Sequence, residues 1–289
     1  MKNISILGAG KVGTSLGRAL VEAGYTIAFL TCSTLAEAEE SRRIIGQGEP
    51  SKNNIHAAQN GEILFITVPD DSIKDIVQEL DFSDIPWLGK TVYHSSGLLA
   101  SEVLQSLRTK GASTASFHPI QSFSNKYAAP SLFQNVYFGL EGEEEAVTLA
   151  KKFVHALGGH SIEISPDDKP VFHAAFSMTS NFFVVLLDSA ITLLKSSGLS
   201  EEKAIQILHP LLEGTLSNIV DNRIRSALTG PIVRGDGQTV KAHLDALKKF
   251  PDIEDVYRQL ANKALEMAID EKTLPAQKIK ELIQILEDR

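Results

Sequence analysis

The sequence has little cysteine and no block of charge of one sign. Cys32 is the single cysteine among 289 residues, which excludes an internal disulfide and any zinc or iron–sulfur site built from several cysteines. We therefore expect a reducing compartment and no metal site. The formal net charge is −8, and the sequence has no lysine-rich or arginine-rich run. Nucleic acids and anionic membranes are therefore not expected as partners.

Long apolar runs and an N-terminal signal segment are also missing. The most apolar stretch, residues 182–194, is interrupted by Asp188 and Ser189 and is too short to span a bilayer, so we expect a buried helix there. No apolar signal segment precedes the first motif, which favours a cytoplasmic protein. The length suggests two domains, each large enough to bury its own core.

A spaced set of glycines lies close to the N-terminus. A short apolar strand expected at residues 4–7 runs into a G-x-G-x-x-G motif at residues 8–13, and a helical pattern follows. The first glycine permits a tight turn, the second lets a pyrophosphate approach the backbone, and the third lets the helix pack against the strand. The helix N-terminus adds N–H groups and a partial positive charge. The motif predicts dinucleotide binding by Gly8, Gly10, Lys11, Val12 and Gly13, and the alternative is a glycine-rich turn in another α/β domain.

The end of the second expected strand, residues 26–30, lacks the acidic residue that selects NAD. An NAD site carries Asp or Glu roughly 20 residues after the glycine motif, where the carboxylate holds the ribose 2′-OH. Here the strand is followed by Thr31-Cys32-Ser33-Thr34. Hydroxyl groups without an acid suit a 2′-phosphate, so we expect NADP in preference to NAD, with Ser33 among the cofactor-binding residues.

Three further apolar runs each end in a polar turn. Helical patterns at residues 73–80 and 100–110 separate them, so strand and helix alternate and the sheet should be mainly parallel. Ligands bind at the carboxyl ends of such strands, so the three turns should face one crevice. The turns begin with Pro69 after residues 63–68, with His94-Ser95-Ser96-Gly97 after residues 91–93, and with His118 after residues 112–117.

These turns supply candidate residues for the cofactor and the substrate. We expect Val68 and Pro69 to form a wall for the nicotinamide ribose. Ser96 can donate and accept hydrogen bonds, and His94 and His118 place imidazoles at strand ends. Ser96 and His118 are therefore candidate catalytic residues. The alternative for each histidine is to cap its own turn by bonding a backbone carbonyl.

The second half of the chain changes character at residues 166–168, Pro-Asp-Asp. Before them, strands expected at residues 136–140 and 161–164 flank a helix at 143–157 and form the far edge of the sheet. After them no convincing strand follows. We predict a dinucleotide-binding Rossmann domain over residues 1–165 and an all-helical domain over residues 166–289. Its helices are expected at residues 168–197, which should be central and buried, and at 201–217, 219–228, 239–249, 254–271 and 276–288.

Polar residues recur at every fourth position along the first of these helices. Lys169, His173, Ser177 and Asn181 advance only about 40° per step, so they form one ridge. An unpaired polar group on a buried helix costs on the order of 1 to 3 kcal/mol, so the ridge requires partners or a cavity. The functional interpretation is a ridge that faces the nucleotide domain, with Lys169 donating a proton to a carbonyl or imine. The alternative is a solvated lysine and small polar residues packed between helices.

A loop with three glycines and a proline lies at residues 229–239. These residues fix an unusual backbone path, and Arg234 and Asp236 are candidates to grip a substrate carboxylate. The alternative is a purely structural turn with an internal salt bridge.

Six motifs together resemble one bacterial family over nearly the whole chain. They are GAGKVG, VPDDSI, HSSG, FHPIQSF, DKPVFHAA and LTGPIVRGD. The family comprises Rossmann-like predicted oxidoreductases with a C-terminal domain of unknown function 2520. It is similar to the larger group of ketopantoate reductase, pyrroline-5-carboxylate reductase, prephenate dehydrogenase and 6-phosphogluconate dehydrogenase. The resemblance implies a second domain of the 6-phosphogluconate dehydrogenase C-terminal type, which binds substrate and forms a homodimer.

Two members of that larger group bear on individual residues. Ketopantoate reductases carry Lys-x3-Asn-x3-Asn with the lysine as acid, and the matching positions here are Lys169, His173 and Ser177. The lysine matches and the asparagines do not, which speaks for Lys169 and against ketopantoate itself. Pyrroline-5-carboxylate reductases carry a Ser-Pro-Gly-Gly-Thr-Thr loop that residues 229–239 resemble in placement, with Arg234 and Asp236 as departures.

Together these residues predict an NADP-dependent reductase of a small carboxylate-bearing carbonyl compound, such as a 2-oxo acid. Lys169 would be the general acid, His173 and Asn181 would orient the substrate beside Ser177, and His118 would line the opposite wall. One alternative is an imine reductase of the pyrroline-5-carboxylate kind. Another is a non-catalytic NADP-binding regulatory protein.

Overall fold

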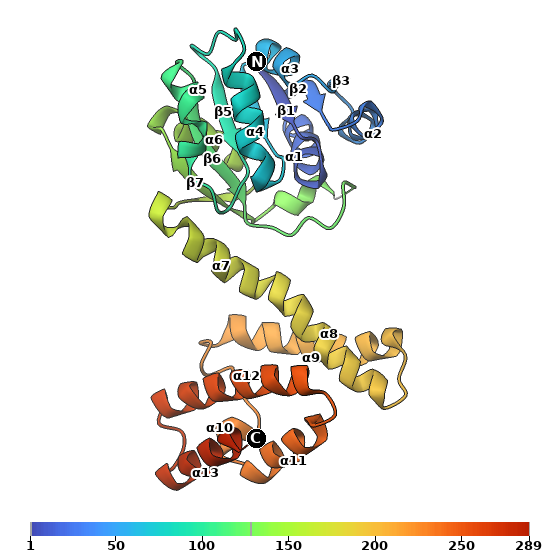
Figure 1. Ribbon diagram of the computed structural model, residues 1–289, viewed down its shortest axis with the longest axis vertical. Helices are drawn as coiled ribbons and strands as arrows, with labels where there is room; N and C mark the ends of the chain where they lie inside the picture. The colour runs from blue at the N-terminus through green and yellow to red at the C-terminus, as the bar shows by residue number, and fades with distance from the viewer. Residues whose placement is uncertain (1, 128, 289) are drawn as a thin grey trace. The chain divides into compact units, whose positions relative to one another are not determined.

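The first compact unit of the chain, residues 1–182, is built on one mixed β-sheet (Figure 1). The computed structural model describes residues 2–127 and 129–288. In the described part the strand order is β3-β2-β1-β4-β5-β6-β7-β8, and all neighbours are parallel except β6 and β7. The strands are β1 (Asn3–Leu7), β2 (Thr26–Thr31), β3 (Glu49–Ser51), β4 (Ile63–Ile66), β5 (Thr91–His94), β6 (Ser113–Pro119), β7 (Tyr137–Gly142) and β8 (His160–Glu163).

The strand order reverses between β1 and β4, which places a crevice at their carboxyl ends. β4 is buried along its whole length, because both faces of the sheet are covered. Ile63 and Phe65 belong to one apolar cluster, whereas Leu64 and Ile66 belong to another. Successive side chains of a strand point to opposite faces, so the two clusters are the cores on the two sides of the sheet.

Helices connect these strands largely where the sequence predicts them. The exception among the strands is β3, whose three residues Glu49–Ser51 include Pro50 and carry no apolar alternation, so it escaped prediction as a short edge strand. The helices of this unit are α1 (Lys11–Glu22), α2 (Leu35–Ile45), α3 (Asn54–Asn60), α4 (Asp70–Asp81), α5 (Gln105–Thr109), α6 (Glu144–Ala156) and α7 (Lys169–Thr179), with one-turn helices η1 (Ser101–Leu104), η2 (Pro130–Phe133) and η3 (Pro166–Asp168).

The second compact unit, residues 183–289, is helical in its described part. Its core lies among α10 to α13, where Val240, Leu244, Leu265 and Leu282 are buried together. The predicted fold class, a mainly parallel sheet followed by a helical domain, is confirmed. The elements are α8 (Asn181–Ser196), which starts in the first unit, α9 (Glu201–Asp221), α10 (Pro231–Arg234), α11 (Gly237–Leu247), α12 (Pro251–Asp270) and α13 (Ala276–Glu287).

Three expectations about the helices are wrong. The helix expected at residues 168–197 is divided into α7 and α8 at Ser180, whose φ of −116° and ψ of −74° depart from those of a regular α-helix. The expected helices 201–217 and 219–228 are replaced by α9, which continues to Asp221. Helix α8 has no buried residue, and Val184 and Val185 are 65% and 60% exposed, so it is not a buried central helix.

The stretch Pro166–Ser196 is long and apolar enough to cross a membrane by length and composition alone.

The compact units divide after Phe182, whereas the sequence placed the domain boundary after residue 165. The reason is that α7 packs with the sheet. Lys169 contacts Ser116 of β6, and the ring of Phe176 stacks on His118 at a centroid distance of 6.4 Å.

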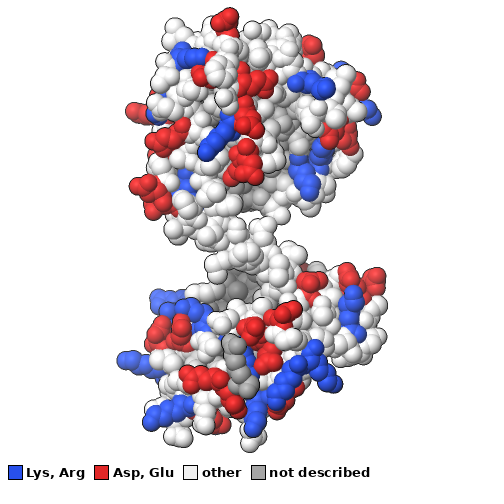
Figure 2. Space-filling view, in the orientation of Figure 1, with Lys and Arg blue, Asp and Glu red and all other residues white. Residues whose placement is uncertain are grey.

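On the face of the molecule drawn in Figure 2, lysine and arginine side chains are interspersed with aspartate and glutamate.

Candidate functional site

The glycine motif forms a tight turn between β1 and α1. Gly8 has φ of +90°, a conformation that side chains disfavour. The N–H groups of Gly8 and Ala9 both donate to the carbonyl of Thr31, at 3.0 and 2.7 Å. The turn is therefore fixed against the end of β2, and α1 begins directly after Gly10.

The space around the three glycines fits a bound pyrophosphate. A Cβ on Gly8 would lie 2.3 Å from Val68 Cγ1, and one on Gly13 would lie 2.3 Å from Thr67 Oγ1. A Cβ on Gly10 would meet its nearest heavy atom at 4.0 Å, so Gly10 faces open space. Gly10 is also the N-cap of α1 and has no side chain to bond the first N–H groups. These N–H groups are left for an anion.

A first cavity of about 460 Å³ opens over this turn, a volume typical of ligand sites. Five predicted cofactor-binding residues line it: Gly8, Gly10, Ser33, Val68 and Pro69. Lys11 and Gly13 are not among its described lining residues, and Val12 lines a second cavity. Thr31 and Cys32, from the strand end where hydroxyl groups were expected to suit the cofactor, also line it. Lining residues that the sequence did not point to are Ala9, Glu37, Lys52, Asn54, Thr67, Ser72, Ile76 and Lys126.

An acidic group lies beside the end of β2, where we expected none. Glu37 accepts hydrogen bonds from Ser33 Oγ at 2.6 Å, from Thr34 Oγ1 at 3.1 Å and from the Thr34 N–H at 3.3 Å. These hydrogen bonds hold the pKa of the Glu37 carboxyl below its usual range. Glu37 stands at the third position of α2 in a capping box with Thr34, which returns its carboxylate to the strand end. The Thr-x-x-Glu spacing was the signal for it in the sequence.

A second cavity of about 500 Å³ lies at the start of α1, where Val12 lines it and Gly10, two residues earlier, lines the first. It brings together four predicted site residues, His118, His173, Ser177 and Asn181. Among its described lining residues none is acidic, lysine or arginine. The others are Ile120, Gln121, Ser122, Phe123, Phe176, Thr179 and Ser180.

His118 presents a neutral imidazole to this cavity. Burial lowers the pKa of His118 to about 4, so the ring is uncharged near pH 7. Its Nδ1 lies 3.0 Å from the Ser95 carbonyl, which can only accept, so Nδ1 carries the hydrogen and Nε2 is an acceptor. A Cβ on Gly97 would lie 2.8 Å from both His118 Nε2 and His173 Cδ2, so only a glycine fits between the two rings.

Lys169 lies behind the wall of the second cavity. Its side chain is 2% exposed, and Nζ donates to Ser116 Oγ at 2.7 Å and to the Ser96 carbonyl at 3.4 Å. Burial lowers the pKa of the Lys169 ammonium, while the charges of Glu141 and Asp70 oppose that shift. Lys169 is not one of the described residues that line either cavity, but its charge lowers the pKa of His118, which lines the second.

Ser96 and His94 have structural bonding patterns. Ser96 Oγ donates to Asp70 at 2.7 Å and accepts from the N–H groups of Leu98 and Leu99 at 3.1 and 2.9 Å. His94 is 1% exposed, and its Nδ1 accepts from the Ser96 N–H at 3.2 Å. Burial lowers the pKa of His94 to about 3. Both side chains organise the turn after β5.

Arg234 and Asp236 belong to the second unit. Asp236 is the N-cap of α11 and accepts from the Thr239 N–H at 3.1 Å and from Thr239 Oγ1 at 2.7 Å. These hydrogen bonds lower the pKa of Asp236. Asp236 is thus bonded within its own loop, and a substrate contact by Arg234 or Asp236 stays a prediction.

Two family models match the chain. The model of a Rossmann-like domain matches residues 2–119, and the model of a domain of unknown function (DUF2520) matches residues 136–264. No protein with a curated function matches the sequence.

Solved structures share this fold over almost the whole chain. A protein from Bacteroides fragilis that is proposed to be an NADP oxidoreductase is 21% identical, with 92% of this chain and 98% of that chain covered and a TM-score of 0.77. A protein from Thermotoga maritima is 27% identical, with coverages of 93% and 99% and a TM-score of 0.70. Pyrroline carboxylate reductase from Plasmodium falciparum, solved with NADP bound, is 15% identical, with coverages of 94% and 97% and a TM-score of 0.62.

Proposed function

The chain is a Rossmann-like protein with a C-terminal domain of unknown function 2520. From this premise we propose that it is an NADP-dependent oxidoreductase that reduces a small carbonyl compound bearing a carboxylate. The observation that carries the proposal is the pair of cavities at the start of α1, one lined by Gly10 and the other by Val12. One has the glycine turn and open backbone that a pyrophosphate needs. The other gathers imidazole, amide and hydroxyl groups.

The first cavity would hold the cofactor. The turn at Gly8, the open face of Gly10 and the first N–H groups of α1 would bind the pyrophosphate, and Val68 and Pro69 would support the nicotinamide ribose. The bound cofactor supplies the hydride, so the chain's own residues have to position the substrate and supply a proton.

The second cavity would hold the substrate. The neutral His118 accepts a hydrogen bond at Nε2, and Ser177 and Asn181 offer neutral donors for a substrate oxygen. His173 is the other imidazole that lines the cavity, with its ring centroid 6.4 Å from that of His118, so we assign it the proton transfer that the sequence assigned to Lys169. The buried Lys169 ammonium would stabilise the negative charge that develops on the substrate oxygen.

A turnover screen tests this proposal. We expect the protein to oxidise NADPH in the presence of at least one member of a panel of 2-oxo acids and cyclic imines. His173→Gln should lower kcat by about 100-fold or more with NADPH binding unchanged, because general acid catalysis contributes about that factor. His155→Gln, on helix α6, is the matched control and should keep wild-type kcat.

The panel also separates the alternatives. The fold shared with a pyrroline carboxylate reductase favours imine reduction as the second candidate. Turnover of cyclic imines, with no turnover of 2-oxo acids, would establish it. NADPH binding without turnover of any member would favour the non-catalytic regulator. Unchanged kcat in His173→Gln would overturn the assignment of the proton donor.

A further inference from the structure

The first cavity contains opposing charges near the end of β2. Glu37, Lys52 and Lys126 are the charged residues among its described lining residues. Glu37 remains ionised beside Ser33, which is where an acidic residue holds the ribose 2′-OH of NAD and repels the 2′-phosphate of NADP. With Glu37 alone, the cavity would select NAD. A preference for NADP therefore requires a cation close to this carboxylate.

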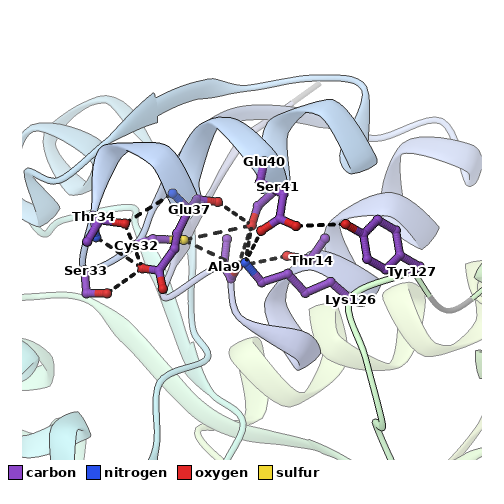
Figure 3. Close-up of polar contacts among 10 residues, drawn as sticks. All are labelled: Ala9, Thr14, Cys32, Ser33, Thr34, Glu37, Glu40, Ser41, Lys126 and Tyr127. Atoms are coloured by element: carbon purple, nitrogen blue, oxygen red, sulfur yellow. Dashed lines mark hydrogen bonds and ion pairs between the residues drawn. The ribbon is translucent and has the colours of Figure 1, made fainter.

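Lys126 is a cation placed at this point by a distant part of the chain. It lies in the irregular segment between β6 and η2, and its Nζ lies 3.1 Å from Glu40 Oε2 and 3.4 Å from Ser41 Oγ, both on α2. Figure 3 shows Lys126 reaching past Ala9 to these two residues, with Cys32 and Glu37 alongside. The Lys126 side chain is 20% exposed, so its ammonium is largely confined to this position.

The contacts of Lys126 place it on the adenosine side of the cavity. The pyrophosphate belongs at the start of α1, where the backbone N–H groups supply the positive charge. Lys126 instead contacts α2, the helix that follows β2, and the ribose 2′ position of a dinucleotide lies at the end of that strand. Lys52 also lines the cavity, but its side chain is exposed, and within the described part of the chain no hydrogen bond fixes it.

The partner of Lys126 can release it without being left unbonded. Tyr127 donates its hydroxyl to Glu40 Oε1 at 2.8 Å, so Glu40 keeps one hydrogen bond when the ammonium turns away. Glu40 is also 41% exposed, so water can replace the lysine. A single ion pair to this partly exposed glutamate contributes little, whereas a lysine to phosphate bond is charge-assisted.

We propose that Lys126 binds the 2′-phosphate of NADP and thereby outweighs Glu37, so that this lysine sets the preference for NADP over NAD. The inference rests on the proposed function. It also assigns Glu37 as the opposing residue, whose carboxylate limits that preference.

Calorimetric titration with two fragments tests Lys126 directly. Adenosine 2′,5′-bisphosphate and adenosine 5′-monophosphate differ only by the 2′-phosphate, and we expect the wild type to bind the bisphosphate more tightly. Lys126→Met should weaken bisphosphate and NADPH binding at least about tenfold, with monophosphate and NADH binding unchanged within about twofold. Glu37→Gln should strengthen NADPH binding and weaken NADH binding.

The matched control is Lys151→Met, which breaks another lysine–glutamate pair, that of Lys151 with Glu163, and should keep wild-type affinities. Equal weakening of NADPH and NADH by Lys126→Met would overturn the inference, because it would place the lysine on a shared phosphate. The inference would also be overturned if Lys52→Met lost the preference for the 2′-phosphate and Lys126→Met kept it. A wild type that binds neither dinucleotide would refute the proposed function itself.

Discussion

At the scale of single residues, burial sets the charge of the two strand-end histidines. Burial lowers the pKa of His94 to about 3 and that of His118 to about 4. Histidine in an unfolded chain titrates near pH 6.5, so the unfolded state takes up protons first as the pH falls. The stability contributed by the neutral rings is therefore complete above about pH 6.5 and is lost progressively as the pH falls towards about 4 for His118 and about 3 for His94.

We predict that His94→Gln reduces this loss. Below about pH 6.5 the free energy of unfolding of the wild type should fall by up to roughly 1.4 kcal/mol per pH unit for each such histidine. Urea unfolding at pH 7, 6 and 5 measures how the free energy of unfolding changes with pH. This pH dependence should be smaller in the variant by about the contribution of one histidine, whatever the stability of the variant at pH 7. His160→Gln replaces an exposed ring and should keep the wild-type slope. An unchanged slope in His94→Gln would contradict the assignment.

The sequence predicted the residues of the glycine turn well because their spacing encodes local geometry. Gly8 has the positive φ that a tight turn needs, and Gly10 faces open space. Glu37 was missed because the rule for NAD sites looks for an acid at the strand end, whereas this one returns to it from the next helix. Lys126 was beyond prediction because it lies in an irregular segment with no periodic pattern, 86 residues from its partner Glu40.

At the scale of elements, strands and helices with strong periodicity were predicted within a few residues, and the failures have physical reasons. The ridge of Lys169, His173, Ser177 and Asn181 does meet partners and a cavity, but a break at Ser180 divides its helix. Helix α8 is apolar yet exposed. The hydrophobicity of a helix predicts that it is covered, but it does not say which chain covers it. We propose that a second copy of the chain covers this helix, as the sequence expectation of a homodimer implies.

Light scattering after size-exclusion chromatography tests that proposal. We expect the wild type to have the mass of two chains. Val185→Glu should shift the protein towards the mass of one chain, because Val185 on α8 is 60% exposed and a carboxylate cannot be buried cheaply. Leu88→Glu places the same charge at another exposed apolar residue, 88% exposed, and should leave the mass unchanged. A single-chain mass for the wild type would refute the homodimer.

At the scale of the whole molecule, the chain pairs a dinucleotide-type sheet unit with a helical unit, each with its own core. Solved oxidoreductases share this arrangement of the chain over more than nine-tenths of its length. The interspersed charges in Figure 2 agree with the net charge of −8 in giving no reason to expect a phosphate backbone as partner. Together with the glycine turn and the cavity over it, these features lead us to propose that the first unit binds a dinucleotide at Gly8 to Gly13.

The most direct test of this claim is calorimetric titration of NADPH into the wild type and Gly10→Ala. Gly10 has φ of −76° and ψ of −149°, a backbone that alanine adopts at some cost, but a Cβ there meets no heavy atom closer than 4.0 Å, so the variant should fold with a melting temperature slightly below that of the wild type. That Cβ would occupy the approach of the pyrophosphate, so we predict that NADPH binds the wild type and binds Gly10→Ala at least about tenfold more weakly. A wild type that does not bind NADPH, or a variant that binds it equally well, would contradict the account.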